Sequence, residues 1–214
     1  MRDFNLVSVS EEKQISEKMA QEISNKMNIV KDAQMNARVR SIGNRLESVL
    51  PNREFDYQFF IVEDKAPNAF TIPGAKIYIH SGLLSFVSDD SELAGVIAHE
   101  MGHAYERHPV KNMSRNYGAG YLASLLTNDP QNSLKTSALN LATGGVLLRY
   151  SRQDEFEADS LGFELLCHSG YGTRGLANFL KKLQLQQQRG VQMTILSTHP
   201  ATSERIQRLE RMSC

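Results

Sequence analysis

The segment IAHEMGHAYERH, residues 97–108, contains the pattern H-E-x-x-H at His99, Glu100 and His103. Residues four apart lie on one face of a helix, so the two imidazoles can bind the same metal ion. The segment before and around them is small and apolar, which predicts that both rings are buried, where unpaired imidazoles would be costly. Glu100 can reach a water molecule on that ion. The alternative, a chance pattern of ordinary polar positions, fits these apolar surroundings poorly.

A catalytic zinc ion takes three protein ligands and leaves a position for water, so a third ligand is required. His108 is nearest, but on a continuing helix it lies about 140° away from the ligand face, and we expect it to be a solvent-facing residue at the helix end. Downstream, Glu155 and Asp159 stand four residues apart in SRQDEFEADSLG. We predict Glu155 as the third ligand and Asp159 as the group that orients a ligating imidazole, with Glu157 pointing elsewhere. A solvated acidic helix start is the alternative.

The elements that position these residues follow from periodicity and capping patterns. Ser8-x-x-Glu11 resembles a capping box ahead of a helical stripe. The sequence predicts helices over about 8–27, 39–49, 91–106, 109–170 with a break at NDPQ, 174–188 and near the end, and strands over 55–61 and 76–81. Residues 63–75 are expected to form a loop, with a turn at Asn68, Ala69 and Pro73–Gly74. This order predicts an α+β fold in which a small sheet lies beside a mostly helical body.

Composition excludes several classes of function. Lys and Arg together number 24, and Asp and Glu also number 24, so the net charge is zero and a nucleic-acid partner is unsupported. The basic stretch near the end is expected to be a solvated helix face. Cys167 and Cys214 are too few for a disulfide framework, and the sequence leaves open whether they pair. No apolar run resembles a signal peptide or a transmembrane helix, although an exported chain without its signal would look the same.

Four motifs occur in a characteristic order: PNAFTIPGAKIYIHSGLL, HEMGH, EFEAD and THPATSER. Together they resemble the HtpX and CAAX-prenyl-protease family of gluzincin metallopeptidases, peptidase family M48. The resemblance covers about residues 5–212 and is strongest to the soluble BepA-like branch of the bacterial envelope and its mitochondrial inner-membrane relatives. The chain shows neither the membrane helices nor the tetratricopeptide repeats of better-known members, which argues against cleavage of prenylated peptides.

The resemblance implies a mostly helical, zincin-like metallopeptidase domain that holds one zinc ion per chain. His99, His103 and Glu155 would bind the zinc, and Asp159 would orient His99. Glu100 would act as the general base that activates zinc-bound water and later protonates the leaving amine. By analogy with such folds, KIYIHSG would be an edge strand along which an extended substrate adds as a further strand.

The segment STHPATSERIQRL carries His199 and Arg205, with an expected helix N-cap at Thr202 or Ser203. Local chemistry favours an exposed turn residue and a surface arginine, whereas the resemblance implies that both face the zinc cleft as catalytic residues. His199 would donate to the substrate's carbonyl oxygen in the transition state, and Arg205 would hold the loop or the substrate backbone. If His199 bound the ion in place of water, the site would be closed and the enzyme latent.

We therefore expect a zinc-dependent metalloendopeptidase that acts on unfolded or misassembled proteins in quality control of the bacterial cell envelope. The expected location is the periplasm or envelope, with a cytoplasmic location and peripheral membrane association left open. Residues 1–214 would form a single metallopeptidase domain, with an N-terminal helical segment at about 8–50 and a catalytic core at about 54–212. The alternative is a catalytically silent zinc-binding chaperone or interaction module, although such a protein would usually have lost Glu100.

Overall fold

A computed structural model describes residues 7–115 and 149–214 of the chain. The predicted helical pattern at 116–148, including the break at NDPQ, lies outside the described residues. The elements are α1 (Val9–Lys26), α2 (Ala33–Glu47), β1 (Gln58–Val62), β2 (Ala69–Ile72), β3 (Lys76–His80), α3 (Ser81–Phe86), α4 (Asp90–Tyr105), α7 (Arg152–Ser169), α8 (Gly175–Gln188), α9 (Ile195–Thr198) and α10 (Ser203–Arg211). The expected capping box at Ser8 and Glu11 opens α1. None of the helices in the described ranges combines the length and apolar character needed to cross a lipid bilayer.

The sheet has three strands in the order β1-β3-β2, with β1 parallel and β2 antiparallel to β3. Two expectations were wrong here. Residues 69–72 form a strand within the expected loop, and β3, expected at the edge, is the central strand. The turn at Pro73–Gly74 does occur, and it folds β2 back onto β3 so that Ala69 pairs with Ile79. All four residues of β2 are buried, so this strand lacks the alternation of a half-buried strand.

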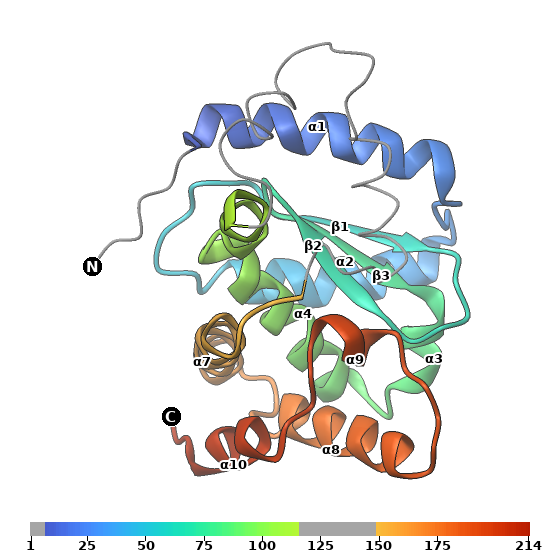
Figure 1. Cartoon of the computed structure of the whole chain (residues 1–214), viewed down its shortest axis with the longest axis vertical. Coiled ribbons are helices and arrows are strands. Elements are labelled where there is room, and N and C mark those ends of the chain that lie inside the picture. Colours follow the sequence, from blue (N-terminus) through green and yellow to red (C-terminus); the bar gives the residue numbers. More distant parts are fainter. Residues whose placement is uncertain (1–6, 116–148) are drawn as a thin grey trace.

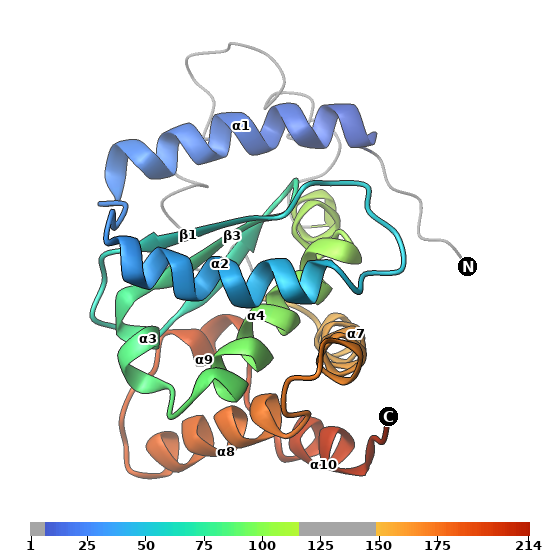
Figure 2. The same cartoon turned by 180° about the vertical axis from the view of Figure 1, so that it is seen from behind.

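Each face of the sheet packs against different helices, because successive side chains of a strand point to opposite faces. Ile61, Ile77 and Ile79 belong to the main hydrophobic core, which includes residues of α2, α4, α7 and α8. Val62 and Tyr78 belong to a second cluster with the apolar stripe of α1. Figures 1 and 2 show this arrangement in both views: α1 covers one face of the sheet, and α4 and α7 lie on the other side.

The C-terminal helices α7, α8 and α10 form one packed group with α4. Helices α7 and α8 both pack against α4, and α10 packs against α7 and α8 (Figure 1). Cys167, near the end of α7, forms a disulfide with Cys214, which closes a loop of chain with a sequence separation of 47 residues. The sequence had left this pairing open. The disulfide joins the two ends of the segment that contains α8, α9 and α10.

Candidate active site

Helix α4 presents the H-E-x-x-H residues in the interior of the molecule. Asp89 caps the helix by accepting a hydrogen bond from the backbone N–H of Glu92. His99, Glu100 and His103 are all buried. The Nε2 atoms of the two histidines lie 3.1 Å apart, one helical turn from each other on the same face.

Helix α7 brings Glu155 to this pair. Its Oε1 lies 3.5 Å from His103 Nε2, and its Oε2 lies 3.5 Å from His99 Nε2. Close packing of α7 on α4 depends on Gly102, because a Cβ atom at that position would lie 2.6 Å from the carbonyl oxygen of Ala158. A larger residue at position 102 would therefore push α7, and Glu155 with it, away from the two histidines.

His199 completes a cluster of four possible ligands. It follows α9 directly, and its Nδ1 lies 3.2 Å from His99 Nε2 and 3.1 Å from Glu155 Oε1. His99, His103, Glu155 and His199 each offer one ligand atom, and these four atoms all lie within 4.8 Å of one another. The cluster is buried throughout. The exposed-turn interpretation of His199 is thus wrong.

The chemistry of this donor set fits a metal ion. The Asp159 carboxylate lies 2.9 Å from His99 Nδ1, and this contact favours the neutral tautomer that carries its proton on Nδ1 and leaves the Nε2 atom facing His103 bare. Two nitrogens bound to one tetrahedral zinc ion would lie about 3.3 Å apart. The observed separations of 3.1 and 3.2 Å around His99 Nε2 are close to that value. Imidazole and carboxylate donors in this number suit a zinc site.

Arg205 does not face open space where a substrate backbone could lie. Its guanidinium donates to both oxygens of Asp159 at 2.7 Å and to the carbonyl oxygen of Pro200 at 3.0 Å, and it also forms an ion pair with Glu155. The side chain is buried, and Thr202 caps α10 just before it. This geometry supports an anchoring role for Arg205 in holding the loop, which was one of its two expected roles.

Burial and neighbouring charges shift the pKa values of Glu155 and His103 in directions that suit ligation. Burial would lower the pKa of His199, but the charges of Glu155 and Glu100 outweigh it and raise that pKa. Burial alone would raise the pKa of Glu155, but the charge of Arg205 and then that of His199 outweigh it and hold that pKa well below the usual value. Burial lowers the pKa of His103 far below its usual value, which leaves the ring neutral. An ionised carboxylate and a neutral imidazole are the forms that bind a metal ion.

Glu100 stands beside the cluster without belonging to it. Its Oε1 lies 3.5 Å from His199 Nε2, and its buried Oε2 has no hydrogen-bond partner among the described residues. Burial raises the pKa of Glu100, and His199 and His99 offset that shift only in part. A pKa raised toward neutrality is what a general base that works near neutral pH requires.

The expectation that His108 faces solvent was wrong. The helix does not continue: α4 ends at Tyr105, Arg107 adopts a left-handed φ of 56°, and a new helical segment starts at His108. His108 is buried, with its Nδ1 3.0 Å from His103 Nδ1. Pro109 was the available signal, because proline is favoured in the first turn of a helix.

Tyr150 lies beside His103, and no pattern in the sequence indicates this position. Its ring stacks on that of His103, with centroids 3.8 Å apart and planes inclined by 20°. The ring is buried, and the hydroxyl has no hydrogen-bond partner among the described residues. In the sequence, Tyr150 is a lone tyrosine before Ser151, the N-cap of α7, and nothing around it indicates a contact with His103.

Comparison with known proteins agrees with this site. Residues 31–213 match the model of peptidase family M48. The chain is 31% identical over 212 residues to metalloprotease LoiP of Escherichia coli, covering 97% of this chain and 82% of that protein. It is 27% identical over 210 residues to the beta-barrel assembly-enhancing protease of Escherichia coli, covering 94% of this chain but only 43% of that protein.

A mitochondrial relative extends the comparison. The mitochondrial metalloendopeptidase OMA1 of Schizosaccharomyces pombe is 27% identical over 175 residues, which is 80% of this chain and 51% of that protein. The chain thus spans about half of some relatives and most of LoiP. The family match covers most of the chain, including every residue of the cluster, and begins after α1. The chain therefore belongs to peptidase family M48.

Proposed function

We propose that this protein is a zinc-dependent endopeptidase that cleaves unfolded or misassembled proteins of the bacterial cell envelope. The observation that carries the proposal is the convergence of His99, His103 and Glu155 on one point, with Glu100 beside them. When bound there, a zinc ion would activate water and polarise the substrate's carbonyl group. One ion per chain is expected, held by those three side chains.

The protein's own residues would handle the protons and the geometry. Glu100 would take a proton from the attacking water and return it to the leaving amine. Asp159 accepts from His99 Nδ1 and thereby orients that ring, as carboxylates commonly do for metal-binding histidines. Arg205 would act through Asp159 and Glu155 and not on the substrate, because its guanidinium is already bound to them.

His199 has two compatible roles. In the described arrangement it is the fourth possible ligand, and four protein ligands characterise closed, structural zinc sites. Displaced from the cluster by a small movement of the loop at 199–202, it would be placed to donate to the substrate's carbonyl oxygen. We propose that the described arrangement is a latent state and that turnover requires His199 to leave it.

The proposed substrate binds in an extended form along β2. Among the described strands, β2 pairs with β3 alone, so its other edge has no strand partner among the described residues, and β2 also packs against α4. All four residues of β2 are buried, so an added strand would first require that edge to be uncovered. Backbone pairing of this type selects for unfolded segments more than for sequence. It replaces the expectation that the KIYIHSG strand binds substrate.

The biological setting rests on resemblance to named relatives. One relative is named a beta-barrel assembly-enhancing protease, which supports a role in the cell envelope. We propose a periplasmic or envelope location, and a single metallopeptidase domain over residues 1–214 with its helical segment at about 8–50 and catalytic core at about 54–212.

The test is digestion of a permanently unfolded protein, such as reduced and alkylated casein, followed by mass spectrometry of the fragments. Wild-type protein loaded with zinc is compared with the same protein plus chelator and with Glu100→Gln. We expect internal cleavage by the first sample alone. Binding of zinc and of the unfolded protein without any cleavage would favour the silent chaperone, and cleavage that survives both the chelator and the substitution would exclude the zinc mechanism.

A further inference from the structure

The second ring nitrogen of His103 faces another histidine. While Nε2 points at the ligand cluster, Nδ1 lies 3.0 Å from His108 Nδ1, and both rings are buried. This contact exists because of the left-handed turn at Arg107, which directs the new helical segment back toward α4. The turn is itself held from α1: Arg107 Nε donates to Glu12 Oε2 at 2.6 Å.

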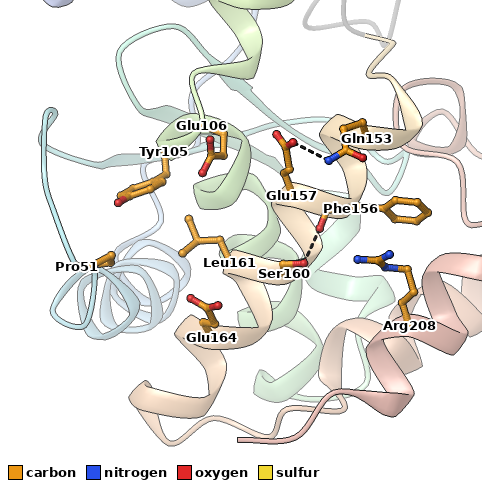
Figure 3. Close-up of a pocket in the computed structure, with 10 residues that line it drawn as sticks. All are labelled: Pro51, Tyr105, Glu106, Gln153, Phe156, Glu157, Ser160, Leu161, Glu164 and Arg208. Atoms are coloured by element: carbon orange, nitrogen blue, oxygen red, sulfur yellow. Dashed lines mark hydrogen bonds between the residues drawn. The ribbon is translucent and has the colours of Figure 1, made fainter. Parts of the chain in front are cut away.

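The contact continues outward to a carboxylate. The other nitrogen of His108, Nε2, lies 3.1 Å from Glu157 Oε2. Gln153 holds the second carboxylate oxygen through a hydrogen bond of 2.8 Å from its Nε2 to Glu157 Oε1, drawn as a dashed line in Figure 3. Glu157 lines a pocket of about 500 Å³ between α4 and α7, and its side chain is 39% exposed. The series of contacts thus runs from the cluster to the surface.

The positions of the protons on the two imidazole rings give this series of hydrogen bonds one direction. A neutral imidazole has one N–H donor and one bare acceptor nitrogen. If His103 Nε2 is bare so that it can bind a metal ion, Nδ1 carries the proton and donates to His108 Nδ1. His108 must then carry its own proton on Nε2, which donates to the Glu157 carboxylate. Each group has a single consistent role.

We propose that His108 and Glu157 are positioning residues that fix the tautomer and orientation of His103 through this series of hydrogen bonds. The proposal rests on the proposed role of His103 as a metal ligand. It gives each α4 histidine its own support: His99 is held by the buried carboxylate of Asp159, and His103 by a histidine whose carboxylate partner lies at the surface. Groups that orient metal-binding histidines commonly contribute 10- to 100-fold in metal affinity, an order-of-magnitude figure.

A second metal ion at His108, Asp154 and Glu157 is the competing interpretation, because their ligand atoms also lie within 4.8 Å of one another. Both oxygens of Asp154 already accept hydrogen bonds within the protein. Oδ2 accepts from the backbone N–H of Ser151 at 2.9 Å, and Arg115 donates to both oxygens at 2.9 and 3.1 Å. His108 Nε2, the nitrogen that faces this pair, lies 3.1 Å from Glu157 Oε2 and 3.6 Å from Asp154 Oδ1, so in the proposed tautomer its proton is directed at Glu157. The residues therefore satisfy one another without an ion.

The experiment measures zinc affinity of the metal-free protein by competition with a chromophoric chelator, together with the protonation of imidazole nitrogens by ¹⁵N NMR. The variants are His108→Ala, His108→Asn and Glu157→Gln. The matched control is Glu164→Gln, which changes a carboxylate on the same helix and in the same pocket (Figure 3). An asparagine oxygen can accept from His103 where alanine cannot, so it tests rescue of the hydrogen bond.

We expect His108→Ala to weaken zinc binding by about 10- to 100-fold, His108→Asn to restore part of that loss, and Glu157→Gln to cause a smaller loss. Glu164→Gln should bind zinc as wild type does, and His103 should carry its proton on Nδ1. Should His108→Ala fail to fold, the zinc affinity of Glu157→Gln tests the proposal instead, because this substitution alters a partly exposed side chain and should leave the fold intact.

Unchanged affinity in Glu157→Gln and His108→Ala, an equal loss in Glu164→Gln, or a His103 proton on Nε2 would each overturn the proposal. Two zinc ions per wild-type chain would establish the competing metal site. Wild-type protein that binds one ion but cleaves nothing would contradict the proposed peptidase function alone, while the affinities of the variants would still judge the role of His108. Wild-type protein that binds no zinc would overturn both.

Discussion

Arg205 binds the carboxylate of Asp159 through two parallel hydrogen bonds, from Nε to Oδ2 and from Nη2 to Oδ1, each of 2.7 Å. Both side chains are buried, and the same carboxylate lies 2.9 Å from His99 Nδ1. One carboxylate therefore connects α10 and α7 to the H-E-x-x-H face of α4, although these helices are far apart in the sequence. Two-point binding fixes the plane of the carboxylate as well as its position.

Removal of Arg205 should destabilise the fold. In Arg205→Ala, the carboxylates of Asp159 and Glu155 would remain buried without their cation, and loss of one partner of a buried ion pair costs about 3–5 kcal/mol. Urea denaturation of the metal-free protein measures the free energy of unfolding of each variant. Arg208→Ala is the control, because Arg208 lies on the same helix but at the surface, over the ring of Phe156. Equal and small losses in the two variants would contradict the anchoring role.

Glu100→Gln should bind zinc normally but fail to hydrolyse peptide bonds. The substitution keeps the shape of the side chain and removes its capacity to accept a proton. Zinc content by atomic absorption and cleavage of unfolded casein are measured on the same preparation. Retention of activity comparable to that of wild type would show that another group is the base.

Glu155→Ala should lose zinc to a greater extent than His108→Ala. The first substitution removes a proposed ligand, whereas the second removes a side chain that contacts a ligand, for which a loss of about 10- to 100-fold is expected. Dialysis against a graded series of chelator concentrations ranks the two proteins. Equal zinc retention would contradict the assignment of Glu155 as a ligand.

His199→Ala should keep zinc while turnover falls by about 10²-fold or more, the loss expected for removal of one transition-state donor. If the described arrangement is the latent state, any slow activation phase seen with wild type on small peptides should disappear in this variant. Progress curves measure both quantities. Wild-type turnover together with wild-type activation would assign His199 a purely structural role.

The core of the site could be predicted because its signals are local. Helical spacing places His99 and His103 on one face, and the i, i+4 spacing does the same for Glu155 and Asp159. The structure brings these four side chains together on α4 and α7, and their roles as ligands and support remain predictions. Capping residues likewise located the starts of α1 and α10.

The features that could not be predicted depend on tertiary contacts or on the point where one helix ends and another begins. Strand β2 is too short and too uniformly buried to show a period of two, and its identity as a strand comes from pairing with β3. The position of His108 was extrapolated along a helix that ends before it. Tyr150 reaches His103 across the fold, and nothing in its neighbourhood in the sequence indicates that contact.

The disulfide between Cys167 and Cys214 would hold the molecule together after cleavage of the backbone between the two cysteines. His199 and Arg205 both lie inside the covalent ring that it closes. A single break in the backbone between these cysteines, for example in the exposed connection around Gly190, would leave the C-terminal fragment attached to α7. Such a nicked chain would migrate as one species until it was reduced. It would keep both residues tethered beside the cluster, and loss of the fragment would require a reductant as well as a cut.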